Sequence, residues 1–159
     1  MDVPDLTLLL DDEAATTRLA AVLAPHLRPG DLIALRGELG VGKTAFARAL
    51  IRALGVAEEV PSPTFTLVQT YEAAAAPVWH FDLYRLADAA EIDELGWDDV
   101  AQEAILLVEW PERAGARLPA DRLELALAYG AGSDRRIATL SPRGAWAGRG
   151  IAAWLAGFS

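Results

Sequence analysis

The chain has 159 residues, about the length of one ordinary domain, and we expect a single domain over residues 1–159. Its formal charge is −9 and its pI is about 4.6, which argues against direct, unaided binding of nucleic acid, because that binding needs a basic surface. The chain has no cysteine and 2 histidines, so it has no disulfide and no thiolate nucleophile, and a zinc site is disfavoured.

The apolar pattern predicts alternating strands and helices. In chain order we expect a strand over 6–10, a helix over 12–27 capped by Asp12, a strand over 32–35, a helix over 43–54, a hairpin of strands 64–71 and 78–82, a helix over 87–95, a strand over 105–109, a hairpin of strands 122–129 and 135–140, and a closing helix over 146–158. This order predicts an α/β protein of three layers, in which helices cover a largely parallel central sheet with antiparallel additions.

Nothing in the sequence suggests a membrane. The N-terminus starts acidic and lacks the basic region of a signal peptide. The longest apolar runs are far shorter than a membrane span. We therefore expect a cytoplasmic protein with no membrane contact.

A glycine-rich loop joins the second predicted strand to the second predicted helix. It matches the P-loop pattern G-x-x-x-x-G-K-[ST] in full. Its residues are Gly37, Glu38, Leu39, Gly40, Val41, Gly42, Lys43 and Thr44. Such a loop turns its N–H groups inward as an anion nest, and the helix N-terminus adds positive charge. The strand before it and the helix after it are the context of a P-loop NTPase, so the loop predicts a site for ATP and Mg²⁺.

The last two loop residues have separate roles. Lys43 is the only lysine in a chain with 13 arginines, which is the usage expected where a compact ammonium is needed. We expect Lys43 to reach the β- and γ-phosphates and to take part in catalysis. Thr44 is expected to offer its hydroxyl to magnesium.

Two acids stand at the ends of predicted strands, where this fold holds its metal ligand. Asp82 ends VWHFD and Glu109 ends ILLVE. Four aliphatic residues precede Glu109, so an unpaired carboxylate there would be costly, and we favour Glu109 as the ligand. His80 and Asp82 share one strand face, which makes them candidates to position water or orient each other. A core histidine and a solvated strand end are the alternatives for these two residues.

The segment 62–65 carries hydroxyls beside prolines. Ser62 lies between Pro61 and Pro63, and Thr64 follows. Such a segment is a candidate switch over the γ-phosphate, with Thr64 as a catalytic hydroxyl. The residues alone favour the alternative of a rigid turn.

Together these motifs resemble the TsaE (YjeE) family of bacterial ATPases. The segments GELGVGKT, SPTFTLVQTYE, HFDLYRL, LGWDD and LLVEWPER occur in the family's order and spacing, from about residue 12 to 129. The resemblance implies an ATP-hydrolysing component of the machinery that makes N6-threonylcarbamoyladenosine next to the anticodon of tRNAs reading codons that start with A. It also implies TsaB and TsaD as partners, ATP hydrolysis that supports repeated turnover, and only indirect contact with tRNA.

The resemblance also implies roles for single residues. Thr44 and Glu109 become the magnesium ligands, Asp82 a residue needed for hydrolysis, and Trp110 a neighbour of the nucleotide. The segment 62–65 becomes switch-like.

On the adenine side, Asp12 and Glu13 match the place where the family holds the ring. An arginine is expected near the nucleotide after residue 129, where the match is poor. Arg136 is our candidate, and Arg135 is the alternative.

Two other functions remain open, a P-loop small-molecule kinase and a non-catalytic ATP-sensing assembly module. A kinase needs an arginine-rich lid, whereas the arginines here are dispersed. A GTPase is disfavoured because the usual N-K-x-D needs an asparagine and the chain has none. The only arginine near the loop in sequence is Arg36, which we expect to point away. We therefore expect a slow ATPase that its partners stimulate.

Overall fold

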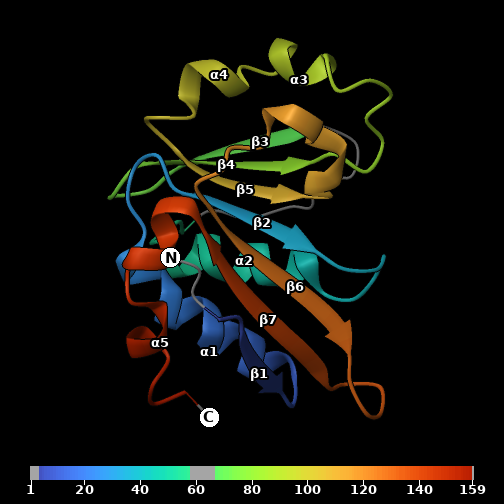
Figure 1. The fold of residues 1–159 in the computed structure, drawn as a ribbon, viewed down its shortest axis with the longest axis vertical. Coiled ribbons are helices and arrows are strands. Elements are labelled where there is room, and N and C mark those ends of the chain that lie inside the picture. The colour runs from blue at the N-terminus through green and yellow to red at the C-terminus, as the bar shows by residue number, and fades with distance from the viewer. Residues whose placement is uncertain (1–3, 58–66, 159) are drawn as a thin grey trace.

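The computed structural model describes residues 4–57 and 67–158, which form one mixed sheet with helices against it (Figure 1). The strands are β1 (Leu6–Leu10), β2 (Leu32–Arg36), β3 (Val68–Glu72), β4 (Pro77–Asp82), β5 (Ile105–Glu109), β6 (Arg122–Tyr129) and β7 (Arg136–Arg143). The α-helices are α1 (Glu13–Leu23), α2 (Lys43–Ala53), α3 (Glu91–Glu94), α4 (Trp97–Val100) and α5 (Ile151–Trp154). The 3₁₀ helices are η1 (Ala24–His26), η2 (Pro111–Arg117) and η3 (Gly144–Gly148).

The sheet has the strand order β1-β7-β6-β2-β5-β4-β3. The neighbours β6, β2, β5 and β4 are parallel to one another, whereas β3, β7 and β1 join by antiparallel pairing. Both predicted hairpins are present, as β3–β4 and β6–β7. The largely parallel sheet with antiparallel additions is thereby confirmed.

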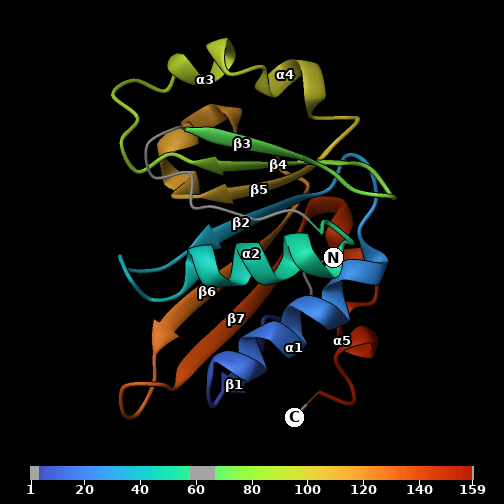
Figure 2. The same ribbon diagram turned by 180° about the vertical axis from the view of Figure 1, so that it is seen from behind.

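The alternation of side chains along the central strands divides the core between the two sheet faces. On β2, Ile33 and Leu35 pack with α1 and α2, whereas Leu32 and Ala34 pack with the segments α3, α4 and η2. The apolar run of β5 divides in the same way, since it is buried on both faces. Figure 2 shows α1 and α2 side by side on one face, so the three layers are confirmed.

Two predicted helices are wrong in length. The expected helix over 87–95 is reduced to the 4 residues of α3, and Gly96, with φ 86°, separates it from α4. The closing helix over 146–158 is replaced by η3 and the 4-residue α5, with Gly150 at φ 79° between them. Gly150, in the left-handed region, interrupts the predicted closing helix. In the other helix the chain turns over 88–90, where the N–H of Ala90 donates to Oδ1 of Asp88 at 3.0 Å, so α-helix begins only at Glu91. The first helix ends as α-helix at Leu23, because Pro25 has no N–H for the next helical bond.

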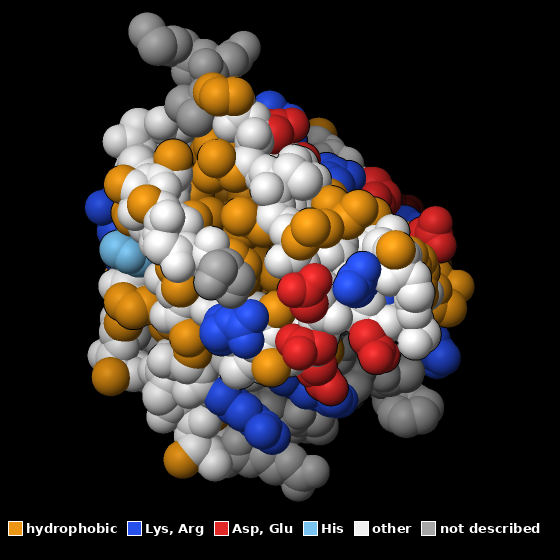
Figure 3. All heavy atoms as spheres, turned by 90° about the horizontal axis from the view of Figure 1, so that it is seen from below, with side chains coloured by type: hydrophobic (Ala, Val, Ile, Leu, Met, Phe, Trp, Pro, Cys, Tyr) orange, Lys and Arg blue, Asp and Glu red, His pale blue; other side chains and the backbone are white. Residues whose placement is uncertain are grey.

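The charges on the face viewed in Figure 3 are mixed. Hydrophobic side chains gather on one part of the face viewed in Figure 3, and acidic and basic side chains alternate on another. That face therefore presents no single basic field in the part of the chain that the structure describes. Across residues 4–57 and 67–158, no helix has the length and apolar character needed to cross a membrane.

The parallel pairing brings three strand ends to one edge of the sheet. Asp82 at the end of β4 is in register with Glu109 at the end of β5, and Glu109 is opposite Leu35 of β2. The loop 37–44 continues from β2 at the same edge. In open α/β sheets, the carboxyl ends of parallel strands are where ligands bind.

Candidate functional site

The loop 37–44 is shaped by glycines. Gly37 has φ 145°, and a Cβ there would lie 2.6 Å from the carbonyl oxygen of Leu127, so no other residue fits without a shift of backbone. Gly42, with φ 118°, caps the N-terminus of α2. Because α2 begins at Lys43, the positive end of its dipole faces the loop. The loop and helix thus form a site suited to an anion.

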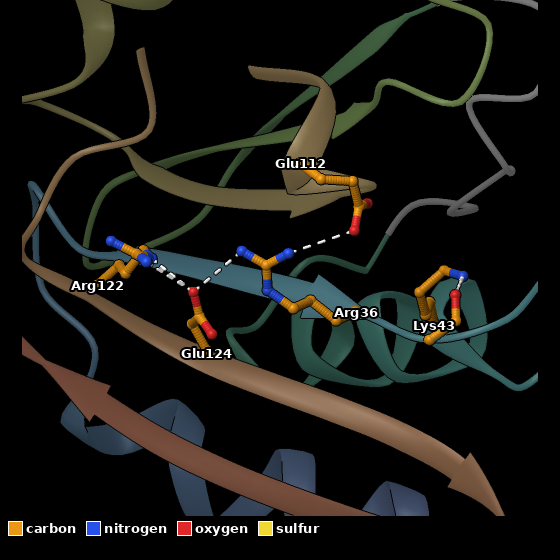
Figure 4. A network of polar contacts seen from close by, with 6 residues as sticks. Arg36, Lys43, Glu112, Arg122 and Glu124 are labelled. Atoms are coloured by element: carbon orange, nitrogen blue, oxygen red, sulfur yellow. Dashed lines mark hydrogen bonds and ion pairs between the residues drawn. The ribbon is translucent and has the colours of Figure 1, made fainter. Parts of the chain in front are cut away.

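Lys43 turns back over the loop (Figure 4). Its Nζ donates hydrogen bonds to the carbonyl oxygens of Gly37 and Glu38, and it lies 3.9 Å from the ring centroid of Trp110. Burial lowers the pKa of the ammonium, while Glu109, Glu112 and Asp82 oppose that shift. A largely buried cation whose hydrogen bonds go to neutral carbonyls is a strong partner for an incoming phosphate.

Thr44 and Glu109 meet beside the loop. The hydroxyl of Thr44 lies 2.9 Å from Oε1 and 3.0 Å from Oε2 of Glu109. The same carboxylate lies 2.7 Å from Nε2 of His80. Glu109 is 2% exposed, so it is not a surface acid, and His80, which is 0% exposed, lies in the core. Glu109 is therefore a buried carboxylate with partners on the loop helix and on β4.

Asp82 lies at the neighbouring strand end. Its Oδ1 accepts a hydrogen bond from the backbone N–H of Tyr84 at 3.1 Å. Burial raises the pKa of the Asp82 carboxyl, although the bond from Tyr84 opposes this and Glu109 adds to it. Asp82 is therefore a better proton acceptor than an ordinary aspartate, which suits a residue that orients water.

Trp110 is held in an unusual conformation. It has φ 58° and is the only non-glycine residue with positive φ among those that the structure describes. Its ring packs against Tyr84, with centroids 5.0 Å apart, and over the Lys43 ammonium. A strained backbone conformation persists where the surrounding contacts hold it. Here the conformation places the Trp110 ring beside the loop lysine.

These groups line a pocket of about 410 Å³. Its predicted members are Leu39, Gly40, Gly42, Lys43, Thr44, Asp82, Glu109 and Trp110. Its other members, which the sequence analysis missed, are Ala45, Leu67, Tyr84 and Arg85. Tyr84 and Arg85 follow Asp82 within HFDLYR, so the motif itself was the signal.

Arg85 corrects one expectation. Sequence distance suggested that no useful arginine lies near the loop, but the turn after β4 brings Arg85 to the pocket wall. Its guanidinium has no ion pair with any residue in the described ranges. Arg36, in contrast, is bound by Glu112 at 3.3 Å and Glu124 at 3.1 Å, as Figure 4 shows.

A second pocket of about 230 Å³ adjoins the first, because Gly42 and Ala45 line both. It brings together the predicted residues Asp12, Glu13, Val41 and Arg136, with Thr16, Leu127 and Asp134 as further members. Asp12 also caps α1 as predicted, with Oδ1 accepting from the N–H of Ala15 at 2.9 Å.

Arg136, rather than Arg135, lies at this second pocket. Its Nε donates to the carbonyl oxygen of Val41 at 2.8 Å, and its guanidinium lies 4.7 Å from the ring centroid of Tyr129. Arg135 is exposed and pairs with Asp11 at 3.8 Å. The predicted switch segment 62–65, with Thr64, lies outside the described residues.

The oxygen ligands at this site suit magnesium, which takes part of its coordination from phosphate and water, better than a metal that needs all its ligands from protein. Across the described part of the chain, no group of three or more His, Cys, Asp or Glu side chains is arranged to hold a metal. Thr44 and Glu109 offer hard oxygens beside the phosphate loop. Mg²⁺ is typically bound by one or two such protein ligands together with phosphates and water.

Comparisons with a family profile, with named relatives and with solved structures all point to the same family. The profile described as "Threonylcarbamoyl adenosine biosynthesis protein TsaE" matches residues 10–137. The protein named "tRNA threonylcarbamoyladenosine biosynthesis protein TsaE" from Bacillus subtilis is 36% identical over 130 residues, covering 81% of this chain and 80% of its own length. The crystal structure of B. subtilis YdiB matches with a TM-score of 0.77 and 30% identity, over 91% of this chain and 89% of that one.

Two relatives with the same TsaE name come from Rickettsia. The one from Rickettsia felis is 42% identical over 106 residues, or 66% of this chain, and the one from Rickettsia conorii is 43% identical over 104 residues, or 65%. The alignments span 62% and 59% of these relatives' own lengths, less than two thirds of each.

Proposed function

The chain belongs to the TsaE family of threonylcarbamoyl adenosine biosynthesis proteins, and on this premise we propose that it is the ATP-hydrolysing component of the machinery that makes N6-threonylcarbamoyladenosine on tRNA. The proposal comprises one P-loop domain over residues 1–159, Mg²⁺ and ATP as ligands, and TsaB–TsaD-type proteins as partners. It places the protein in the cytoplasm, where tRNAs are modified. With a formal charge of −9, the chain reaches tRNA through its partners rather than directly.

The observation that carries the ATPase proposal is the meeting of Thr44 and Glu109 at the N-terminus of α2. A hydroxyl on the phosphate loop and a carboxylate on the adjacent strand are the two protein ligands that a loop-bound Mg²⁺ needs. Figure 4 shows the loop lysine on the same helix end, with its ammonium turned toward the loop.

In the proposed complex the loop N–H groups and Lys43 bind the β- and γ-phosphates. Lys43 exchanges its carbonyl partners, Gly37 and Glu38, for phosphate oxygens, and this exchange strengthens each hydrogen bond by adding charge. Thr44 and Glu109 hold the magnesium ion. When bound, the ion neutralises negative charge on the phosphate oxygens.

Hydrolysis needs a group that orients water and a group that balances charge. Asp82 is placed for the first, because it borders the pocket with a raised pKa and is not bound by Thr44 or His80. Arg85 is the candidate for the second, since it lies at the same pocket without an ion-pair partner in the described ranges. Thr64 stays a predicted catalytic residue.

The adenosine part of the nucleotide is assigned to the second pocket. Asp12 and Glu13 supply acceptors there, and Arg136 lies on its wall. Trp110 borders the phosphate pocket through a ring that already contacts the Lys43 ammonium.

Reconstituted tRNA modification tests the proposal. Purified TsaB and TsaD, a source of threonylcarbamoyl groups and a substrate tRNA are combined with the wild-type chain or with Lys43→Ala. We expect repeated turnover with the wild type and only a first round with the variant. Equal modification by both would overturn the ATPase role. Phosphate transfer to a metabolite instead of water would favour a kinase.

A further inference from the structure

His80 lies in the wall behind the proposed metal site. It is 0% exposed and sits on β4, in register with Leu107 of β5. Residues two apart on a strand share one face, so His80 faces the same side as Val78, which packs in the α1–α2 core. His80 thus places an imidazole among aliphatic neighbours, at a position where a leucine would be expected.

Within residues 4–57 and 67–158, one ring nitrogen of His80 has a hydrogen-bond partner and the other has none. Nε2 lies 2.7 Å from Oε2 of Glu109, and a carboxylate only accepts, so Nε2 carries the hydrogen and donates it. Nδ1 is buried and has no hydrogen-bond partner among the residues that the structure describes. Because buried polar atoms are nearly always paired, His80 carries a cost that leucine would avoid. Its one bond, to Glu109, is the feature that offsets this cost.

That bond distinguishes the two carboxylate oxygens of Glu109, because His80 contacts only Oε2. Among the described residues, Glu109 accepts from Thr44, whose hydroxyl lies near both carboxylate oxygens, and from His80, which binds Oε2. The Thr44 hydroxyl is itself assigned to the metal, so its bond to Glu109 is given up when the ion binds. The bond from His80 to Oε2 does not involve Thr44, so it can persist and hold the carboxylate in place while Oε1 is released for the ion.

We propose that His80 is a positioning residue that orients Glu109 for magnesium before the ion arrives. The inference rests on the proposed function, because it assumes that Glu109 is a metal ligand. It predicts that His80 affects the affinity for the ion and leaves the affinity for metal-free nucleotide unchanged. Groups that hydrogen-bond a metal ligand typically change metal affinity by about 10- to 100-fold when they are removed.

Two substitutions of His80 separate the effect of its hydrogen bond to Glu109 from the effect of its packing. His80→Leu fills the same wall without a donor, and His80→Gln places an amide N–H near the position of Nε2. ATP affinity is measured by calorimetry with Mg²⁺ and with EDTA, and Mn²⁺ affinity of the ATP complex by electron paramagnetic resonance. We expect His80→Leu to lose about ten-fold in Mn²⁺ affinity with unchanged ATP affinity in EDTA, and His80→Gln to recover most of the loss.

Three results are decisive. Equal metal affinity in the wild type and both variants overturns the positioning role. A loss of ATP affinity in EDTA that matches the loss with Mg²⁺ also overturns it, because that result indicates a merely structural effect. A wild type whose ATP binding does not depend on metal instead overturns the proposed function, so the two failures are distinguishable.

Nitrogen-15 spectroscopy of the metal-free wild type gives a readout that needs no variant to fold. We expect the signature of a ring that carries a hydrogen on Nε2. The opposite tautomer would remove the bond to Glu109 and overturn the inference.

Discussion

The hydroxyl oxygen of Thr44 lies 2.9 Å from Oε1 of Glu109, although the two residues are 65 positions apart in the chain. The first belongs to the helix that follows the phosphate loop, and the second ends the strand beside it. Their contact means that the two proposed magnesium ligands are already together before any ligand binds. A site assembled in this way loses little conformational freedom on binding.

Replacing Lys43 tests the phosphate loop. Lys43→Ala removes a charge-assisted contact worth about 1.5–3 kcal/mol, so we expect ATP affinity to fall about ten- to a hundred-fold. Lys43→Arg should not restore it, because the planar guanidinium does not fit the place of an ammonium. The control is Arg52→Ala, which removes an exposed cation from the same helix. Calorimetry that shows wild-type affinity for Lys43→Ala would contradict the assignment.

The two strand-end acids should differ in what they support. Glu109→Gln removes a metal ligand, and we expect the gain in ATP affinity that Mg²⁺ provides to shrink. Asp82→Asn should leave binding nearly unchanged and reduce hydrolysis about 10²-fold, the usual range for a lost proton acceptor. Binding is measured with and without Mg²⁺, and hydrolysis by phosphate release. If the two variants exchange these behaviours, the division of roles is wrong.

Arg136 and Arg135 form a matched pair for testing the second pocket. Arg136 donates to the carbonyl of Val41 within the loop, whereas Arg135 is exposed and bound to Asp11 at 3.8 Å. We expect Arg136→Ala to weaken ATP binding about ten-fold, through the lost support of the loop and the lost contact with nucleotide. Arg135→Ala should change the affinity less than two-fold, in keeping with exposed ion pairs. Equal effects in calorimetry would remove Arg136 from the site.

The pH dependence of stability should reveal the buried charge of Asp82. Because burial raises the pKa of Asp82, the folded protein binds more protons than the unfolded chain above about pH 3.9, and stability falls as the pH rises through this window. Asp82→Asn removes that fall, so its melting temperature relative to the wild type should rise between about pH 4 and pH 7.

Asp93 provides a control, because its pKa is shifted in the opposite direction to that of Asp82. The hydrogen bonds from Arg117 lower the pKa of the Asp93 carboxyl, so its contribution is present at neutral pH and is lost as the pH falls through the lowered pKa. Asp93→Asn should therefore lose melting temperature at pH 7 and approach the wild type in acid. The same trend in both variants, measured without nucleotide or metal, would contradict the assigned shifts.

The phosphate site could be predicted from the sequence because its signals are local. The loop 37–44 is continuous, and the aliphatic run before Glu109 marks a strand buried on both faces. The parallel pairing then brings Glu109 to the loop by a general rule of such sheets. Lys43, Thr44 and Asp82 came together for the same reason.

The rest of the site depends on register and turns that sequence patterns do not fix. Arg135 and Arg136 are adjacent, and only the pairing of Arg136 with Tyr129 of β6 and Leu10 of β1 decides which one approaches the loop. Arg85 reaches the pocket through the turn after β4, although it is distant from the loop in sequence. The two shortened helices show the same limit, since Asp88 closes a turn within one predicted helix and Gly150 takes a left-handed conformation within the other.

Phosphate release by the purified chain, measured with Mg²⁺ alone and then with TsaB and TsaD added, tests the central claim most directly. Lys43, Asp82 and an exposed Arg85 line the pocket, and in the proposed mechanism they account for slow cleavage by the chain alone. We expect low activity alone and marked stimulation by the pair, below the 10³-fold or so that one supplied cation reaches in related phosphoryl-transfer enzymes. Equal rates in the two assays would contradict the claim that this is a partner-dependent ATPase.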